Sequence, residues 1–152
     1  MSLLTVTSPA FTHGESIPAQ YTCDGQGHSP ALAWVNAPPE TKSFVLLVHD
    51  PDAPAKDWIH WLVVNIPPTT VRVAENSSPI GGTTLLNDSG AAKYDDLCPP
   101  RGQHRYYFKI YALDIPHVSG GTRGEVETAM AGHILAQDEL LGLYQRLAKA
   151  VN

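Results

Sequence analysis

Short apolar stretches recur along the chain, and pairs of prolines or glycines separate them. The run Phe44–Val48 is apolar throughout and contains β-branched residues, so it predicts a buried strand. Residues 104–113 place His104 and Tyr106 at the polar start of a face that becomes apolar further in. That pattern suits a strand that enters the core from a site at its rim. Six strands are predicted in all: Leu4–Thr7, Ala31–Val35, Ser43–Asp50, Ile59–Ile66, Thr83–Leu86 and His104–Leu113.

The last third of the chain contains helical spacing. Apolar residues recur every three or four positions from Arg123 to Gly132, and Thr122 before them is a typical N-cap, so this stretch predicts a helix. Apolar residues also recur at helical spacing from Leu140 to Ala148, but Gly142 lies among them. The hydrophobic pattern therefore leaves residues 137–146 open between helix and strand.

Length and composition favour a small globular protein with many short elements. The chain has 152 residues, and we expect one domain over residues 1–152. Its 13 prolines and 12 glycines are scattered, which is typical of all-β folds with rigid turns. The net charge of -5 and the lack of a Lys/Arg run argue against nucleic-acid binding. Because the amino terminus has neither a basic region nor a long apolar stretch, we expect no secretory signal, no membrane span and a cytoplasmic location.

The two cysteines, Cys23 and Cys98, do not have the spacing of metal ligands. Cytoplasmic proteins keep their thiols reduced, so we expect both to be free. A disulfide between them is the alternative.

Polar residues collect where the predicted strand 43–50 ends. Asp50 and Asp52 belong to the sequence Asp-Pro-Asp-Ala-Pro, which ends at Pro54. Its two prolines end the strand and stiffen the turn that follows. His60 follows in the sequence Trp-Ile-His-Trp, whose indoles are either an aromatic wall or part of the core. Two carboxylates, an imidazole and two indoles thus meet at the rim of one sheet, which predicts a binding site.

A second set of candidates precedes the strand 104–113. Cys98, Pro99 and Pro100 begin a rigid loop that runs to Gly102, and the main-chain N–H groups of its non-proline residues are available to an anion. His104 and Tyr106 come directly after it. An aspartate beside a histidine raises the pKa of the imidazole and fixes its orientation, so we expect an electropositive recess in which an imidazolium meets an anion. The alternative is that these polar groups are buried and satisfy one another.

Other chemistries lack their motifs. No His-Glu-x-x-His zinc motif, Gly-x-Ser-x-Gly elbow or glycine-rich phosphate loop ahead of a helix occurs in the sequence. Cys98 as a nucleophile has no helix N-terminus to lower its pKa. We therefore predict no catalytic residue, metal ligand or cofactor. The other histidines are interpreted as turn, surface or packing residues, with His28 and His49 as minor candidates for the border of the site: His13, His28, His49, His117 and His133.

Several spaced motifs resemble the phosphatidylethanolamine-binding protein family. They are the Asp-Pro-Asp-Ala-Pro segment, Trp-Ile-His-Trp followed by Val-Val-Asn-Ile-Pro, and Pro-Pro-x-Gly-x-His-Arg-Tyr, which ends at Tyr106. The match runs from about Ser8 to Arg146. Three further segments resemble the bacterial Raf-kinase-inhibitor-like branch of the family: Tyr21–Gly25, Ser29–Trp34 and Thr122–Ala136.

The resemblance implies a mainly β fold, a two-sheet antiparallel Greek-key β-sandwich with a few short peripheral helices. It also implies that the segment after Gly132 is a strand, and we follow it over the helical periodicity. The family has an anion pocket at one end of the sandwich, partly walled by the Ala53–Pro54 turn. Carried onto this chain, the ligand-binding residues are Asp50, Asp52, Pro54, His60, Cys98, Pro99, Pro100, His104 and Tyr106.

The implied function is non-enzymatic binding of a small phosphate-like anion or a phosphoethanolamine-type headgroup, with a regulatory role. We expect Asp50 to orient His60 or His104, and Asp52 to face the amine of a zwitterionic ligand. Two alternatives remain: an inhibitor of a kinase or protease, and an acid–base hydrolase that uses the same pocket. A homodimer is also open, because Tyr107 and Tyr111 are expected to be only half covered.

Overall fold

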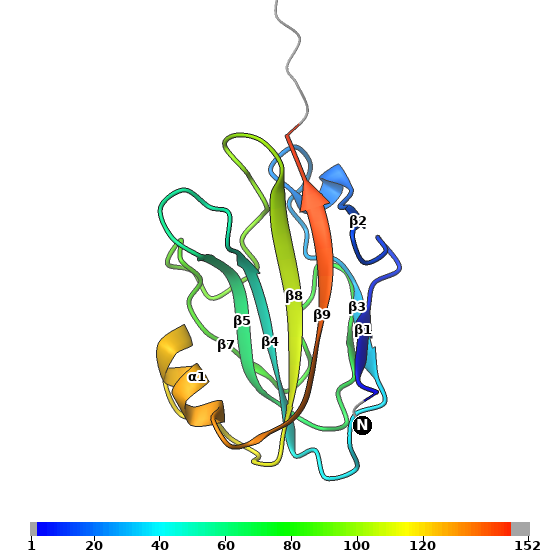
Figure 1. Cartoon of the computed structure of the whole chain (residues 1–152), viewed down its shortest axis with the longest axis vertical. Helices are drawn as coiled ribbons and strands as arrows, with labels where there is room; N and C mark the ends of the chain where they lie inside the picture. Colours follow the sequence, from blue (N-terminus) through cyan, green and yellow to red (C-terminus); the bar gives the residue numbers. More distant parts are fainter. Residues whose placement is uncertain (1–2, 147–152) are drawn as a thin grey trace, which may run out of the picture.

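Two β-sheets pack face to face in the computed structural model of the chain, which describes residues 3–146 (Figure 1). All strand pairs are antiparallel except β2, which runs parallel to β9 at one edge. The predicted two-sheet β-sandwich is confirmed, with this one exception to antiparallel pairing. The small sheet has the order β1 (Thr5–Thr7), β3 (Leu32–Val35) and β6 (Arg72–Val73). The large sheet has the order β2 (Glu15–Ser16), β9 (Ile134–Tyr144), β8 (His104–Leu113), β4 (Ser43–Asp50), β5 (Trp58–Ile66) and β7 (Thr83–Thr84).

Strand β4 is buried on both of its faces, which explains its uninterrupted apolar run. One face joins the core between the two sheets, where Phe44 packs edge-on against Trp34 of the small sheet. The other face carries Val45 and Leu47 and is covered by helix α1 (Arg123–Met130), which contributes Val126 to this second core. The central strand is therefore fixed from two sides, and its carboxyl end is a rigid place from which to present a site.

Most predicted elements are present, and the differences lie at sheet edges. Strands β4 and β8 have the predicted bounds, whereas β7 is only two residues long and two short strands, β2 and β6, were not predicted. Short edge strands carry too few residues to show an alternating pattern. The helix is confirmed together with its cap: the Thr122 side chain accepts the Glu125 N–H, and Glu125 in turn accepts the Gly121 N–H. A short 3-10 helix, η1, spans Ala19–Tyr21.

Strand β9 resolves the segment that the hydrophobic pattern left open. It pairs with β8 along the whole of that neighbour, from His104 opposite Tyr144 to Leu113 opposite Ile134. The expectation from the family resemblance is therefore correct and the helical periodicity is misleading, because sheet pairing overrides a weak local pattern. Two residues of that helical pattern, Leu147 and Ala148, lie outside the described residues.

The prediction of free thiols is wrong, because Cys23 and Cys98 form a disulfide across a sequence separation of 75. The backbone brings them together: Thr22 and Leu97 form a parallel bridge, and the Cys23 N–H donates to the Leu97 carbonyl at 3.0 Å. The prediction rested on the cellular compartment and contained no information about which loops are neighbours. The bond ties the loop before β8 to the turn after η1.

The expected half-covered aromatic face is only partly present. Tyr111 is 8% exposed and belongs to the core beneath α1, whereas Tyr107 remains partly exposed. A homodimer through this face stays a prediction with less support than the sequence suggested.

Candidate functional site

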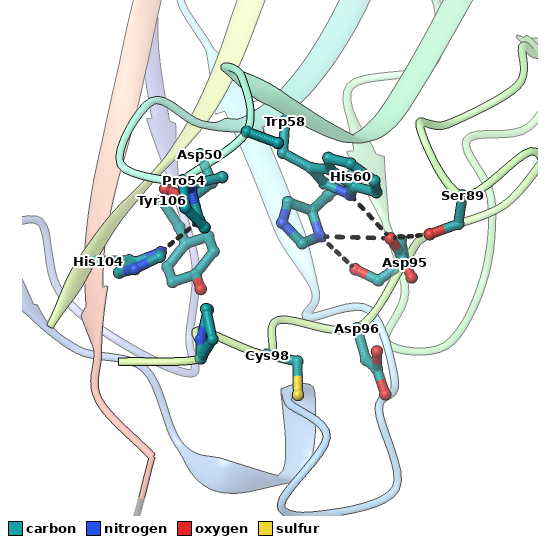
Figure 2. Close-up of a pocket in the computed structure, with 13 residues that line it drawn as sticks. Asp50, Pro54, Trp58, His60, Ser89, Asp95, Asp96, Cys98, His104 and Tyr106 are labelled. Carbon is teal, nitrogen blue, oxygen red and sulfur yellow. Dashed lines mark hydrogen bonds and ion pairs between the residues drawn. The ribbon is translucent and has the colours of Figure 1, made fainter. Parts of the chain in front are cut away.

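A cavity of about 320 Å³ opens at one end of the sandwich, where β4 ends and β5 and β8 begin (Figure 2). Because neighbouring strands in this part of the sheet are antiparallel, the end of β4 lies beside the starts of both of its partners. The loop before β8 closes the remaining side. The residues that line the cavity are Asp50, Ala53, Pro54, Ala55, Trp58, His60, Ser89, Asp95, Asp96, Cys98, Pro100, His104 and Tyr106.

All but two of the residues predicted from the sequence line this cavity; Asp52 and Pro99 do not. Ser89, Asp95 and Asp96 also line the cavity and were not predicted from the sequence. The two aspartates are separated from the Cys-Pro-Pro loop only by Leu97, and extending that loop by three residues would have included them. Nothing in the sequence singles out Ser89. Of the two indoles considered as an aromatic wall, Trp58 lines the cavity and Trp61 is buried in the core.

His104 and Asp50 form a buried pair. Nδ1 of His104 lies 2.6 Å from Oδ2 of Asp50, and the two residues are 6% and 3% exposed. The other oxygen of Asp50 accepts the Asp52 N–H at 2.8 Å, which fixes the carboxylate in the turn. Asp50 therefore orients His104 rather than His60.

His60 is held by the opposite wall of the cavity. Its Nδ1 lies 2.8 Å from the Asp95 main-chain oxygen, which can only accept, so Nδ1 carries the proton. The Asp95 N–H donates back to the His60 carbonyl at 2.8 Å. Figure 2 shows Nδ1 turned to Asp95 and the other edge of the ring turned toward Tyr106 and His104.

Burial determines the charge of His60. The side chain is 6% exposed, and desolvation lowers the pKa of the imidazole even though the Asp95 carbonyl and nearby carboxylates oppose the shift. Near neutral pH the ring is therefore uncharged, and its Nε2 is a hydrogen-bond acceptor. This differs from the imidazolium that the sequence analysis expected at this position.

Tyr106 supplies a buried hydroxyl between the two histidines. Its ring packs edge-on against His60 at 5.5 Å and is stacked on His104 at 6.2 Å between ring centroids. The residue is 0% exposed, and its hydroxyl has no partner in hydrogen-bond geometry. Burial and then the Asp50 carboxylate raise the pKa of Tyr106, so the hydroxyl keeps its proton and is an unused donor.

Carboxylates make the cavity more acidic than predicted. Asp95 accepts hydrogen bonds from the Trp58 indole at 3.1 Å and from the Ser89 hydroxyl at 2.7 Å, and it lies 4.0 Å from Nδ1 of His60. Asp96 has no ion pair with any described residue. Neither lysine nor arginine is among the described residues that line the cavity. The expected electropositive recess is thus a mixed surface, with Asp50, His104 and Tyr106 on one wall and His60, Asp95 and Asp96 on the other (Figure 2).

Asp52 has a different partner from the one expected. Its two oxygens accept from the Arg105 guanidinium at 2.9 and 2.8 Å, and Oδ2 also accepts the Arg105 N–H at 2.9 Å. These hydrogen bonds lower the pKa of Asp52 to about 2. A carboxylate neutralised in this way, and outside the cavity, is poorly placed to receive the amine of a ligand.

Residues 3–146 contain no group of three or more histidine, cysteine or acidic side chains arranged to hold a metal ion. No helix in this range has the length and apolar character needed to cross a membrane.

Fold and site together define a two-sheet β-sandwich with one small polar cavity at the end of its central strands. The sequence model of the phosphatidylethanolamine-binding protein family matches residues 7–145, nearly the whole described range. The chain therefore belongs to the phosphatidylethanolamine-binding protein family.

Individual relatives agree with this assignment. A protein of Methanothermobacter thermautotrophicus named only UPF0098 protein is 43% identical, covering 94% of this chain and 99% of the relative. A UPF0098 protein of Aquifex aeolicus is 42% identical, covering 95% and 90%. The crystal structure of CT736 of Chlamydia trachomatis, described as a homolog of phosphatidylethanolamine-binding protein, superposes with a TM-score of 0.89 at 41% identity, covering 96% of this chain and 99% of that one. E. coli YbcL, described as a member of the mammalian family, superposes with a TM-score of 0.87 at 31% identity, covering 95% and 99%.

Proposed function

We propose that this protein is a non-enzymatic binding protein for a small phosphate monoester or phospholipid-type headgroup, with a regulatory role. One observation carries the proposal: a fully buried hydroxyl, Tyr106, with no partner, stands in a cavity between two oriented histidines. A buried donor without a partner costs about 1–3 kcal/mol, so its retention is best explained by a ligand that accepts from it.

The hydrogen-bonding pattern favours a phosphate that retains one proton. Tyr106 donates to one phosphate oxygen, and the P–OH group of a monoanion donates to Nε2 of neutral His60. When the pH falls, the His60 imidazole gains a second N–H and binding strengthens; when it rises, the phosphate loses the proton that it donates to Nε2 of His60 and binding weakens. Two or three charge-assisted hydrogen bonds of roughly 1.5–3 kcal/mol each in a small wet cavity correspond to micromolar to millimolar affinity.

The acidic side of the cavity supports a zwitterionic ligand. Asp95 and Asp96 take the place that the sequence analysis gave to Asp52, and an ammonium group beside them offsets the repulsion that they exert on phosphate. A phosphoethanolamine headgroup has both charges at a separation that suits a cavity of about 320 Å³. Simple phosphate esters of the same size are expected to bind more weakly.

The arrangement of possible nucleophiles supports binding over catalysis. The Ser89 hydroxyl donates to Asp95 rather than to a histidine, and Cys98 is held in the disulfide. Within the described cavity lining neither a hydroxyl nor a thiol is activated by an imidazole. The cytoplasmic location stays a prediction. The Cys23–Cys98 disulfide argues against a reducing compartment such as the cytoplasm, because such bonds persist mainly in oxidising compartments.

The proposal is tested by NMR titration with phosphoethanolamine and ethyl phosphate at pH 6 and pH 8. In the Tyr106→Phe variant, we expect the Kd for both ligands to rise about tenfold, since one hydrogen bond is lost. The matched control is Tyr107→Phe, the next residue of β8 on the opposite face, which should bind like the unaltered protein. Equal affinity in Tyr106→Phe and in the control would reject the site. Asp96→Asn should weaken phosphoethanolamine binding and leave ethyl phosphate unchanged.

A further inference from the structure

A second cavity, of about 370 Å³, lies behind the loop that closes the first. The two are separated by successive residues of one segment: Lys93 and Tyr94 line the second cavity, whereas Asp95 and Asp96 line the first. Strand β5 contributes to both in the same way, with His60 in the first and its neighbour Trp61 in the second. The family assignment and the proposed function above give this second cavity no role.

One residue in the lining of the second cavity, Trp61, has a buried donor without a partner. Trp61 is 1% exposed, and its indole N–H makes no hydrogen bond. The neighbouring Tyr94 ring packs edge-on against it at 5.6 Å, but the Tyr94 hydroxyl is already committed to the Tyr21 carbonyl at 2.9 Å. The indole is therefore the counterpart, in this cavity, of the unused Tyr106 hydroxyl in the first.

Further unused donors line the same cavity. No described side chain pairs with the Lys93 ammonium or the His28 imidazole, and both residues line the cavity. The main-chain N–H groups of Ser77 and Ser78, also at its wall, do not donate to any group of the described protein. Asn76, at the start of this turn, has a positive φ of 57° and donates its own N–H to the Ser29 carbonyl, which holds the turn in place.

Carboxylates are excluded from the wall of this cavity. None of its described lining residues is acidic, although the protein as a whole has a net charge of -5. Glu75, next to Asn76 in sequence, is bound by the Tyr21 hydroxyl at 2.6 Å and is not part of the lining. This concave surface has one lysine, one histidine, free amide N–H groups and a buried indole N–H, and it has no carboxylate. Such a set of donors is suited to binding a small oxyanion.

We propose that this second cavity is a binding site for a small oxyanion, with Lys93 as the charged contact and the Trp61 indole N–H and the Ser77–Ser78 turn as neutral donors. The chemistry is that of inorganic phosphate or of a terminal phosphate on a larger molecule. This site is distinct from the first, whose Asp95 and Asp96 favour a ligand that also carries a cationic group.

The three indole N–H resonances give a separate readout for each site. Trp61 reports the second cavity, Trp58 reports the first through its hydrogen bond to Asp95, and Trp34, buried in the core, is the internal control. Inorganic phosphate is titrated into the ¹⁵N-labelled protein at constant ionic strength, with chloride replaced by phosphate. We expect the Trp61 resonance to move downfield and saturate, and the Trp34 resonance to stay in place.

Variants decide whether the response belongs to this site. Lys93→Ala should raise the Kd obtained from the Trp61 curve about tenfold, because a charge-assisted contact is lost. Lys42→Ala, an exposed lysine before β4, is the matched control and should leave that Kd unchanged. Tyr106→Phe should alter only the Trp58 curve.

Three results would overturn the proposal: a Trp61 resonance that does not move, equal Kd values in Lys93→Ala and Lys42→Ala, or a Trp61 curve that follows the Trp58 curve in Tyr106→Phe. If the Trp61 resonance moves and the Trp58 resonance does not, the result supports the second site even if the first cavity does not bind phosphate.

To separate the two sources of phosphate, the titration is repeated with glucose 6-phosphate. A Kd equal to that of inorganic phosphate supports a terminal phosphate as ligand, and a much weaker Kd restricts the site to the free ion.

Discussion

Removal of the Cys23–Cys98 disulfide is expected to destabilise the protein by a few kcal/mol without unfolding it. The bond closes a loop with a sequence separation of 75. A chain-entropy estimate for a loop of that length gives an entropy change of about 15 cal/mol/K, or about 4.5 kcal/mol at 25 °C. Measured losses of this kind are typically about 2–5 kcal/mol, and each kcal/mol lowers the Tm of a chain of this size by about 2–4 °C. We therefore expect the Tm to fall by roughly 5–15 °C.

The fold itself should survive, because other contacts hold the same segments. Thr22 and Leu97 remain bridged through the backbone, and Tyr94 still donates to the Tyr21 carbonyl. The Cys23→Ser/Cys98→Ser double variant should thus keep its far-UV circular dichroism spectrum and unfold at a lower urea concentration. Addition of reductant to the unaltered protein should reproduce that shift, and reductant should have no effect on the double variant.

Two results would refute this reasoning. One is a double variant with the same unfolding midpoint as the oxidised protein. The other is alkylation of two thiols in the folded protein purified without reductant, which would show that the bond is not formed.

Two further predictions concern stability. His49 is stacked on Tyr107, and burial lowers the pKa of its imidazole below the value in the unfolded chain. The unfolded chain therefore binds more protons than the folded protein when the pH is low. This contribution to the free energy of unfolding is complete above about pH 6.5 and is lost as the pH falls below that value. The urea midpoint should therefore fall from pH 7.5 to pH 5.5, and by less in His49→Gln; an equal fall in both proteins would contradict this account. Gly142→Ala places a Cβ against Ile17 and Phe11 and should cost about 1–3 kcal/mol in urea denaturation, whereas Gly124→Ala in α1 meets nothing and should cost nothing. If the Gly142→Ala protein has the same urea midpoint as the Gly124→Ala control, the core beside β9 can make room for the added Cβ and the prediction is wrong.

Local signals in the sequence were sufficient for the central strands and for half of the site. Strands β4 and β8 have strong apolar or alternating patterns, so their bounds could be predicted to the residue. Asp50, His60, His104 and Tyr106 stand at the ends of such elements, where a site is expected. The order of several motifs along the chain identified the family, which in turn settled β9.

The contacts between these residues depended on tertiary structure. The sequence placed two aspartates and two histidines near one another but could not assign the partners. Strand pairing brings Asp50 to His104, the loop before β8 brings the Asp95 carbonyl to His60, and Arg105 neutralises Asp52 outside the cavity.

The sequence by itself determined which segments become strands and which polar residues lie at their ends, because these depend on patterns within a few residues. Only the tertiary structure decided the disulfide, the acidic wall of the first cavity and the donor-rich second cavity. Each of these brings together segments that are distant in sequence. The partner of a side chain is set by which loops the sheets hold side by side, and no local pattern encodes that neighbourhood.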